Sequence, residues 1–246
     1  MGQANIRLYV DHTLGQGQSI ALTREQAHYL FGVMRLGVGD RVKLFNGHAG
    51  EWLANVHEAG KRGGTLECTT QSRAQHNPPD VWLLFAPIKK ARTDFIVEKA
   101  TEMGAARILP VQTAFTNSER IRQDRLQAHA IEAAEQCGGT FVPEVEALQK
   151  LDTLLNHWPE DRQLMFCDEA LAECSYALTG GLASEGSGEK WAILIGPEGG
   201  FSDAERKRLS SLPFSTAIRL GPRILRADTA AVAALTLWQS NLGDWT

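Results

Sequence analysis

Two loops carry the residue types best suited to chemistry, and each follows a predicted strand of this 246-residue chain. The first, GPEGGFS at 196–202, contains adjacent glycines, which permit positive φ and let backbone N–H groups approach a ligand closely. Its sequence is neither the dinucleotide-binding pattern nor the phosphate-binding P-loop. The alternative for this loop is a tight turn between a strand and a helix, with Ser202 as the helix N-cap.

The second loop, LGPRILRADT at 220–229, places Arg226 against the start of a predicted helix. A helix N-terminus does not favour a cation, so an arginine there indicates an anionic partner. Asp228 is predicted to be the N-cap of that helix. A third cluster, KKAR at 89–92, also follows a strand, and either binds phosphate or forms a solvated charged surface.

The elements that position these loops alternate from Val81 onward between apolar strands and amphipathic helices, which predicts a parallel sheet covered on both faces. Ligands bind at the carboxyl edge of such a sheet, where both loops would meet. Strands are expected at 81–86, 107–112, 163–167, 191–195 and 216–220. Helices are expected at 93–103, 119–136 and 202–212, and in a last segment whose buried stripe is Ala231, Ala234, Leu235 and Trp238.

Residues 1–72 are β-rich, with short strands expected at 6–10, 18–22, 41–46, 51–57 and 65–69. One helix interrupts them, with a capping box of Thr23 and Gln26 and an apolar face of Ala27, Leu30, Phe31 and Met34. Five strands and a helix suggest a small barrel, a shape often used to bind RNA. We therefore expect a barrel domain at 1–72, a linker at 73–80 and a second domain at 81–246.

The composition is that of a globular protein, with 43% hydrophobic residues and a formal net charge of −4. That charge is uneven, because residues 1–77 sum to +2 and the remainder to −6. No apolar run approaches the ~20 residues that span a bilayer, and the charged N-terminus lacks the apolar core of a secretion signal. Cys68, Cys137, Cys167 and Cys174 lack metal-ligand spacing. A cytoplasmic protein without metal or membrane is expected.

Four segments together resemble the ribosomal RNA small subunit methyltransferase E family of the SPOUT class. They are MRLGVGDRVKLFNGHAGEW at 34–52, EKATEMGAARILPVQT at 98–113, GPEGGFSDAE at 196–205 and LGPRILRADTA at 220–230. The resemblance implies an α/β fold in which a knotted parallel-sheet methyltransferase domain follows a PUA-like barrel. It also implies S-adenosylmethionine-dependent methylation of N3 of one uridine in the 16S rRNA of the small ribosomal subunit, and a homodimer in which the final helix packs against its partner.

On this resemblance, site residues take three roles. Arg226 stabilises negative charge on the uracil carbonyl oxygens, and Asp228 is the nearest candidate to accept the N3 proton, although its N-cap role is preferred. Phosphates of the RNA are expected at Lys89, Arg92 and Arg223. Gly199→Val is expected to fill the space beside the cofactor. The expected cofactor contacts are Ile195, Gly196, Pro197, Glu198, Gly199, Gly200, Leu220, Gly221, Ile224, Leu225 and Thr229.

The sequence departs from the family pattern at two places. Gly139 stands where the family usually has an arginine, and Asp228 stands where it usually has a glutamate, which reaches one methylene further. Two alternatives to the uridine N3 reaction stay open. One is ribose 2′-O-methylation by an enzyme of the same class, against which the barrel argues, and the other is a non-catalytic RNA-binding protein of this fold.

Overall fold

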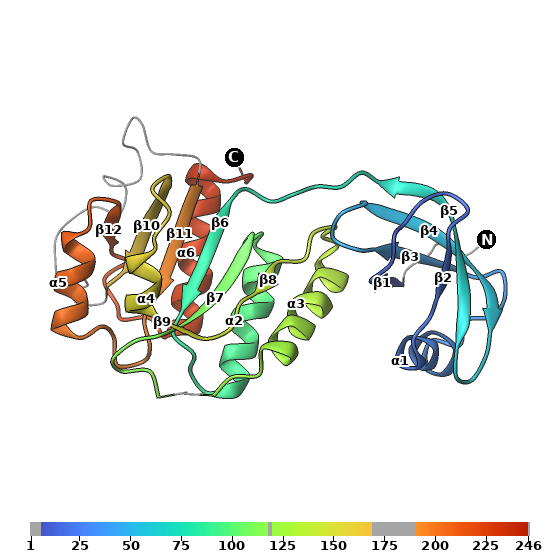
Figure 1. The fold of residues 1–246 in the computed structure, drawn as a ribbon, viewed down its shortest axis with the longest axis horizontal. Helices are drawn as coiled ribbons and strands as arrows, with labels where there is room; N and C mark the ends of the chain where they lie inside the picture. The colour runs from blue at the N-terminus through green and yellow to red at the C-terminus, as the bar shows by residue number, and fades with distance from the viewer. Residues whose placement is uncertain (1–5, 118–119, 169–189, 246) are drawn as a thin grey trace. The chain divides into compact units, whose positions relative to one another are not determined.

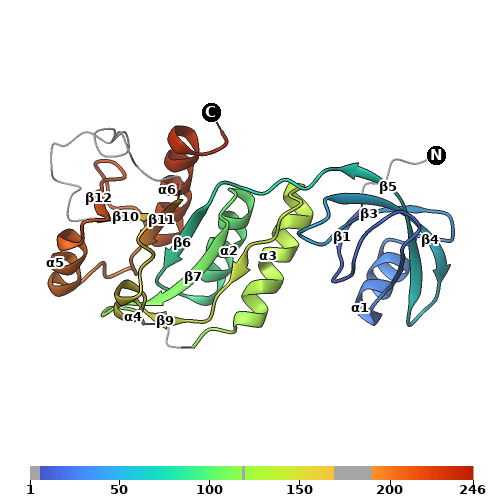
Figure 2. The same cartoon turned by 45° about the horizontal axis from the view of Figure 1, so that its top comes forward.

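The computed structural model describes residues 6–117, 120–168 and 190–245 (Figures 1 and 2). Contacts divide the chain into two compact units. The barrel unit comprises the residues through Asn77 together with Ala134–Val142, and the sheet unit comprises Pro78–Ala133 and the residues from Pro143 onward. The break after Asn77 falls inside the expected linker at 73–80, whereas 134–142 join the barrel unit from far along the chain.

The barrel unit contains a five-stranded sheet in the order β1-β3-β4-β5-β2. Pairing is antiparallel except between β1 and β3, and shifts of register between β4 and β5 help the sheet to curl. Its core is apolar and includes Ile20, Leu30, Val42, Leu44 and Leu66. The strands are β1 (Arg7–Tyr9), β2 (Ser19–Ala21), β3 (Arg41–Phe45), β4 (Glu51–Ala59) and β5 (Gly64–Arg73).

The predicted capping box of Thr23 and Gln26 is present at the start of α1 (Arg24–Ala27). A π-helical turn, η1 (His28–Val33), follows directly. Ala27 and Leu30 are buried as expected, but Met34 is 41% exposed, so its assignment to the apolar face was wrong. The amide of Met34 donates to the carbonyl of Tyr29, five residues back, and this wider turn rotates Met34 off the buried face.

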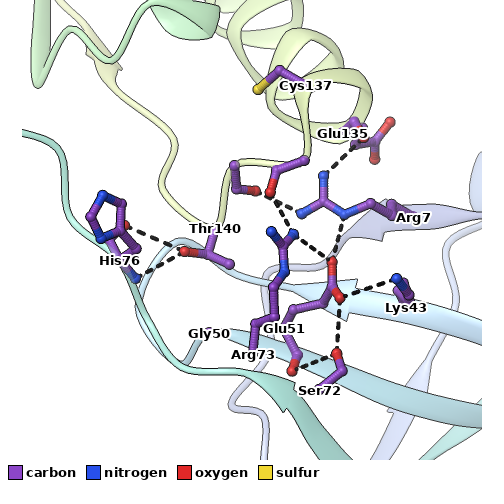
Figure 3. A network of polar contacts seen from close by, with 12 residues as sticks. Arg7, Lys43, Gly50, Glu51, Ser72, Arg73, His76, Glu135, Cys137 and Thr140 are labelled. Atoms are coloured by element: carbon purple, nitrogen blue, oxygen red, sulfur yellow. Dashed lines mark hydrogen bonds and ion pairs between the residues drawn. The ribbon is translucent and has the colours of Figure 1, made fainter. Parts of the chain in front are cut away.

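A buried carboxylate joins the barrel strands to the segment 134–142 (Figure 3). The side chain of Glu51 is 1% exposed and accepts from Arg7 Nε at 2.7 Å, Arg73 Nη2 at 3.0 Å and Ser72 Oγ at 2.9 Å. Burial would raise the pKa of Glu51, but these hydrogen bonds and the charge of Arg73 outweigh it and lower that pKa to about 2. Glu51 is therefore ionised at neutral pH.

The two arginines that hold Glu51 also bind carbonyls at the end of α3 (Gln123–Cys137) and just beyond it. Arg7 donates to the carbonyls of Ala134, at 2.7 Å, and of Glu135 and Gly139, while Arg73 donates to that of Gly138 (Figure 3). The last carbonyls of a helix have no intrahelical partner and carry partial negative charge. Guanidinium groups anchored by Glu51 therefore satisfy the end of α3.

The sheet unit is built on strands that pair only in parallel among the described residues, in the order β12-β10-β11-β6-β7-β8, with β9 beside β7. Buried apolar side chains fill these strands on both faces, as predicted for a covered parallel sheet. The strands are β6 (Val81–Phe85), β7 (Arg107–Gln112), β8 (Glu144–Val145), β9 (Gln149–Lys150), β10 (Arg162–Cys167), β11 (Lys190–Ile195) and β12 (Ser215–Ile218).

The predicted helices of the sheet unit lie near their predicted positions. Helix α4 and strands β8 and β9 were not predicted from the sequence. Gly104, after α2, has the expected positive φ of +76°. The predicted stripe of the last helix is buried, with Trp238 1% exposed, and that helix packs on α2 and β11. Besides α3, the helices are α2 (Lys90–Glu102), α4 (Leu151–Asn156), α5 (Asp203–Ser211) and α6 (Ala227–Leu242).

Candidate active site

Both predicted loops line one pocket of about 550 Å³ in the sheet unit. The pocket lies at the carboxyl ends of β6, β10 and β11, where an open parallel sheet usually binds its ligand. Its volume falls within the about 300–1,000 Å³ typical of small-molecule sites. The lining residues are Lys89, Arg92, Cys167, Ile195, Gly196, Pro197, Glu198, Gly199, Ile224, Leu225, Arg226, Ala227 and Ala230.

Not every predicted cofactor-binding residue lines this pocket, and neither does Arg223, which was predicted to bind RNA. Leu220, Gly221 and Arg223 line an adjoining cavity of about 40 Å³, which shares Cys167, Ile224, Leu225 and Ala230 with the larger one. Gly200 and Thr229 line neither pocket. The sequence therefore predicted correctly that both loops reach the pocket. Part of the second loop lines the small adjoining cavity instead.

The glycine loop is held between β11 and α5 by local hydrogen bonds. The amide of Gly200 donates to the carbonyl of Pro197 at 2.9 Å, and Gly200 has φ of +68°, which favours glycine. Ser202 and Glu205 form the predicted capping box at the start of α5. A Cβ on Gly196 would lie 3.2 Å from ring carbons of the buried Phe201, so the ring would have to move by a few tenths of an ångström to accommodate it.

Gly199 lies beside Phe115 as well as at the pocket. A Cβ there would contact the Cβ of Phe115 at 3.4 Å, an ordinary van der Waals distance. That Gly199→Val fills the space beside the cofactor stays a prediction. Gly199 contributes its backbone to the pocket.

The second loop ends at Arg226, which is itself the N-cap of α6 and makes no side-chain cap bond. The N-cap assignment of Asp228 was therefore wrong. Its carboxylate instead accepts the N–H of Thr229 at 2.9 Å from within the first turn. Asp228 does not line the pocket, whereas exposed Arg226 does and has no ion pair among the described residues.

The cationic side chains at the pocket differ in whether a carboxylate already pairs with them. Arg92 lies 3.4 Å from Glu198 and 3.8 Å from Asp228, so two carboxylates already hold it. Lys89 is exposed and has no ion pair within the described part of the chain. Of the three cations predicted near the cofactor or RNA at this pocket, Arg226 and Lys89 are available to an anion, and Arg92 is shared.

Cys167 was missed as a site residue, although it ends β10 at the same edge of the sheet. It lines both cavities, and burial raises the pKa of its thiol to about 12. At neutral pH it is therefore a neutral apolar wall. The signal available in the sequence was its place as the last residue of the strand predicted at 163–167. The structure pairs that strand with the one that ends at Ile195.

The remaining ligand and membrane expectations can be compared with residues 6–117, 120–168 and 190–245. There, no group of three or more His, Cys, Asp or Glu side chains is arranged to hold a metal, and no helix is long and apolar enough to cross a membrane. Cys68, Cys137 and Cys167 are free thiols, and Cys174 lies outside the described residues.

Comparison with known proteins agrees with the geometry of both units. Residues 75–239 match a family described as an RNA methyltransferase domain, and residues 22–67 match an RNA methyltransferase PUA domain. The ribosomal RNA small subunit methyltransferase E of Rickettsia conorii is 31% identical over 231 residues, which are 93% of each chain. This chain belongs to the ribosomal RNA small subunit methyltransferase E family. It is an RNA methyltransferase with the knotted SPOUT fold and a PUA-like barrel.

Two solved structures extend the similarity to three dimensions. The enzyme of that name from Neisseria gonorrhoeae, bound to S-adenosylmethionine, superimposes with a TM-score of 0.84 at 26% identity over 98% of this chain and 99% of that one. A Legionella pneumophila protein with the same cofactor gives 0.84 at 28% identity over 99% of this chain and all of that one. The fold predicted from the motifs is thereby confirmed.

Proposed function

We propose that this methyltransferase uses S-adenosylmethionine to methylate N3 of one uridine in the 16S rRNA of the small ribosomal subunit, in the cytoplasm. The observation that carries the proposal is the single pocket of about 550 Å³ in which the glycine loop and Arg226 meet. Membership of the family gives the class of reaction, and the residues of the pocket give their roles.

The pocket suits S-adenosylmethionine in shape and chemistry. Ile195, Leu225 and Ala230 supply apolar walls, and the turn at Gly199 supplies backbone at close range. Glycine at 196 lets the loop backbone pack closely against Phe201 while it lines the pocket. When bound, this cofactor supplies a methyl group on a sulfonium centre to a nucleophile held in line with it.

Arg226 acts on the uracil. Neutral N3 carries a proton and offers no free electron pair, so that proton must leave as the N–C bond forms. The electrons released are shared with the two neighbouring carbonyl oxygens, and a guanidinium without an ion pair at the pocket stabilises them there. The N-cap position at α6 keeps this cation at the pocket rim.

Asp228 remains a proposed proton acceptor, and its contacts favour a second role. Its Oδ2 lies 3.8 Å from Arg92 Nε, and Arg92 lines the pocket while Asp228 does not. Asp228 is therefore well placed to position Arg92 beside Glu198. Lys89, with Arg92 and Arg223, would bind phosphates of the RNA on either side of the target.

The barrel unit is proposed to add contacts to the RNA. On the barrel, exposed Lys61 lines a pocket of about 550 Å³ with His28 and Phe31, and it has no ion pair among the described residues. Such a cation beside apolar side chains suits nucleic acid.

A homodimer is the proposed assembly. In α6, Trp238 is buried within its own chain, so other residues of the helix would form the dimer contact.

Mapping of modified nucleosides in 16S rRNA tests the reaction. Cells that lack this protein should lose one 3-methyluridine, and the wild-type chain, but not the Arg226→Ala variant, should restore it. Calorimetry should detect S-adenosylmethionine binding to both. Loss of a ribose 2′-O-methyl group instead would overturn the N3 assignment, and absence of both a nucleoside change and binding heat would leave a non-catalytic RNA-binding protein.

A further inference from the structure

A second pocket, of about 240 Å³, adjoins the proposed cofactor site. It shares Lys89, Pro197 and Glu198 with the larger pocket, so these residues form the wall between the two. Its volume is below the about 300–1,000 Å³ of ordinary small-molecule sites, which suits one planar ring. The other lining residues are Pro87, Ile88, Lys90, Phe115 and Asn117.

Phe115 gives this pocket an aromatic face. Its side chain follows the carboxyl end of β7, adjacent to β6, and is 46% exposed, so part of the ring is open to a ligand. On one side it lies against the backbone of Gly199 in the glycine loop. An exposed ring at the edge of a methyltransferase pocket offers a surface on which a flat ligand can stack.

The backbone around Phe115 is fixed before any ligand binds. The amide of Thr113 donates to Thr116 Oγ1 at 2.8 Å, and the amide of Thr116 donates to the carbonyl of Thr113. These two bonds close a turn that contains Phe115. The amide of Ala114 donates to Glu205 Oε1 at 2.8 Å. Because Glu205 also completes the capping box of α5, one carboxylate ties the aromatic turn to the helix that follows the glycine loop.

The charges beside the ring favour nucleic acid. Lys89 and Lys90 both line the pocket, both are exposed, and neither has an ion pair among the described residues. The amide of Asn117 adds donors and an acceptor that can pair with the edge of a base. A ring for stacking, two cations for a phosphate and an amide are the groups with which proteins bind an unpaired nucleotide.

We propose that this pocket binds one unpaired nucleobase next to the methylated uridine, stacked on Phe115, with its phosphate at Lys89 and Lys90. The inference rests on the proposed function, since the larger pocket must hold the target base and the cofactor. Stacking the neighbour on the far side of the Pro197–Glu198 wall would hold the target strand in register and help to keep the target base unstacked.

Affinity for RNA tests the subsite without a catalytic readout. Binding is measured by filter retention of purified small ribosomal subunits with S-adenosylhomocysteine present. Phe115→Leu keeps an apolar side chain against Gly199 and removes the stacking ring, and it should weaken RNA binding about 5- to 150-fold, the range that corresponds to about 1–3 kcal/mol per stacked base. Phe115→Tyr should retain wild-type affinity.

Phe95→Leu is the matched control, because Phe95 is also exposed, at 38%, on α2 of the same unit but lines neither pocket. The inference fails if Phe115→Leu binds subunits as tightly as Phe95→Leu. The fate of the proposed function is read separately, from calorimetry with S-adenosylmethionine and from the methylated nucleoside. A product other than 3-methyluridine with a selective loss of affinity in Phe115→Leu would overturn the reaction and support the subsite.

Discussion

Replacement of the buried carboxylate of Glu51 should loosen the barrel unit by an amount that its surroundings allow us to work out. The pKa falls from its usual 4.5 to about 2, because the hydrogen bonds of Arg73, Arg7 and Ser72 outweigh the effect of burial. At about 1.36 kcal/mol per pKa unit, this difference corresponds to about 3 kcal/mol of stability in the ionised form. With the side chain 1% exposed, solvent screening reduces the value little.

The sign of the pH dependence follows from the lowered pKa. The contribution of Glu51 is fully present above pH 4.5 and is lost as the pH falls through about 2, because the unfolded chain binds the proton first. Glu51→Gln removes the charge at constant shape and leaves Arg7, Lys43 and Arg73 around a neutral amide. The variant should therefore lose about 3 kcal/mol at pH 7 and show a flatter acid dependence than the wild type.

Hydrogen exchange of the full-length protein measures this loss locally, after correction for intrinsic exchange rates. Peptides from β1, β4 and the segment 134–142 should lose protection in Glu51→Gln, while peptides from β6 and β11 should keep it. Glu58→Gln, a matched change at an exposed position of β4, is the control. Equal protection in the two variants at pH 7, or equal slopes below pH 4.5, would refute the reasoning.

Three further outcomes are expected. Arg226→Ala should lower kcat by about 10²–10³, as for loss of one donor to a developing oxyanion, with little change in the Kd for S-adenosylmethionine; equal losses in both would contradict its role at the uracil. Gly196→Ala should weaken cofactor binding in calorimetry, because its Cβ would lie 3.2 Å from the ring of Phe201, and an unchanged Kd would show that the loop tolerates the shift. Lys61→Glu should weaken RNA binding at low salt and reduce the salt slope by about one, whereas an unchanged slope would remove the barrel cation from the RNA contact.

The features that the sequence predicted well depend on neighbours a few residues apart. Both capping boxes, at Thr23 and at Ser202, involve residues three positions apart, and both are present. The buried stripe around Trp238 likewise follows from helical periodicity. The alternating strands and helices placed both loops at one edge of a parallel sheet. The family motifs added the fold, since strand patterns alone give no order of strands in a sheet.

What the sequence could not predict depends on contacts outside local patterns. Asp228 resembled an N-cap, but the N-cap is two residues earlier, at Arg226, whose side chain makes no cap bond. That Phe115 lies against Gly199 could not be predicted, because the contact joins segments far apart in the sequence. The pairing of Arg92 with Glu198 and Asp228 could likewise not be predicted, because only the fold brings these carboxylates to it.

The hydrogen-bond network around Glu51 limits how the chain can be divided into fragments or recombined with a homologue. The barrel is completed by residues 134–142, which the chain reaches only after building β6, α2, β7 and most of α3. A fragment that stops at Asn77 would leave Arg7 and Arg73 without the carbonyls of the helix end, and the complementary fragment would expose those carbonyls to water. The barrel unit is thus not encoded by one continuous segment. An exchange of this unit between homologues would have to transfer two separate stretches of sequence at once.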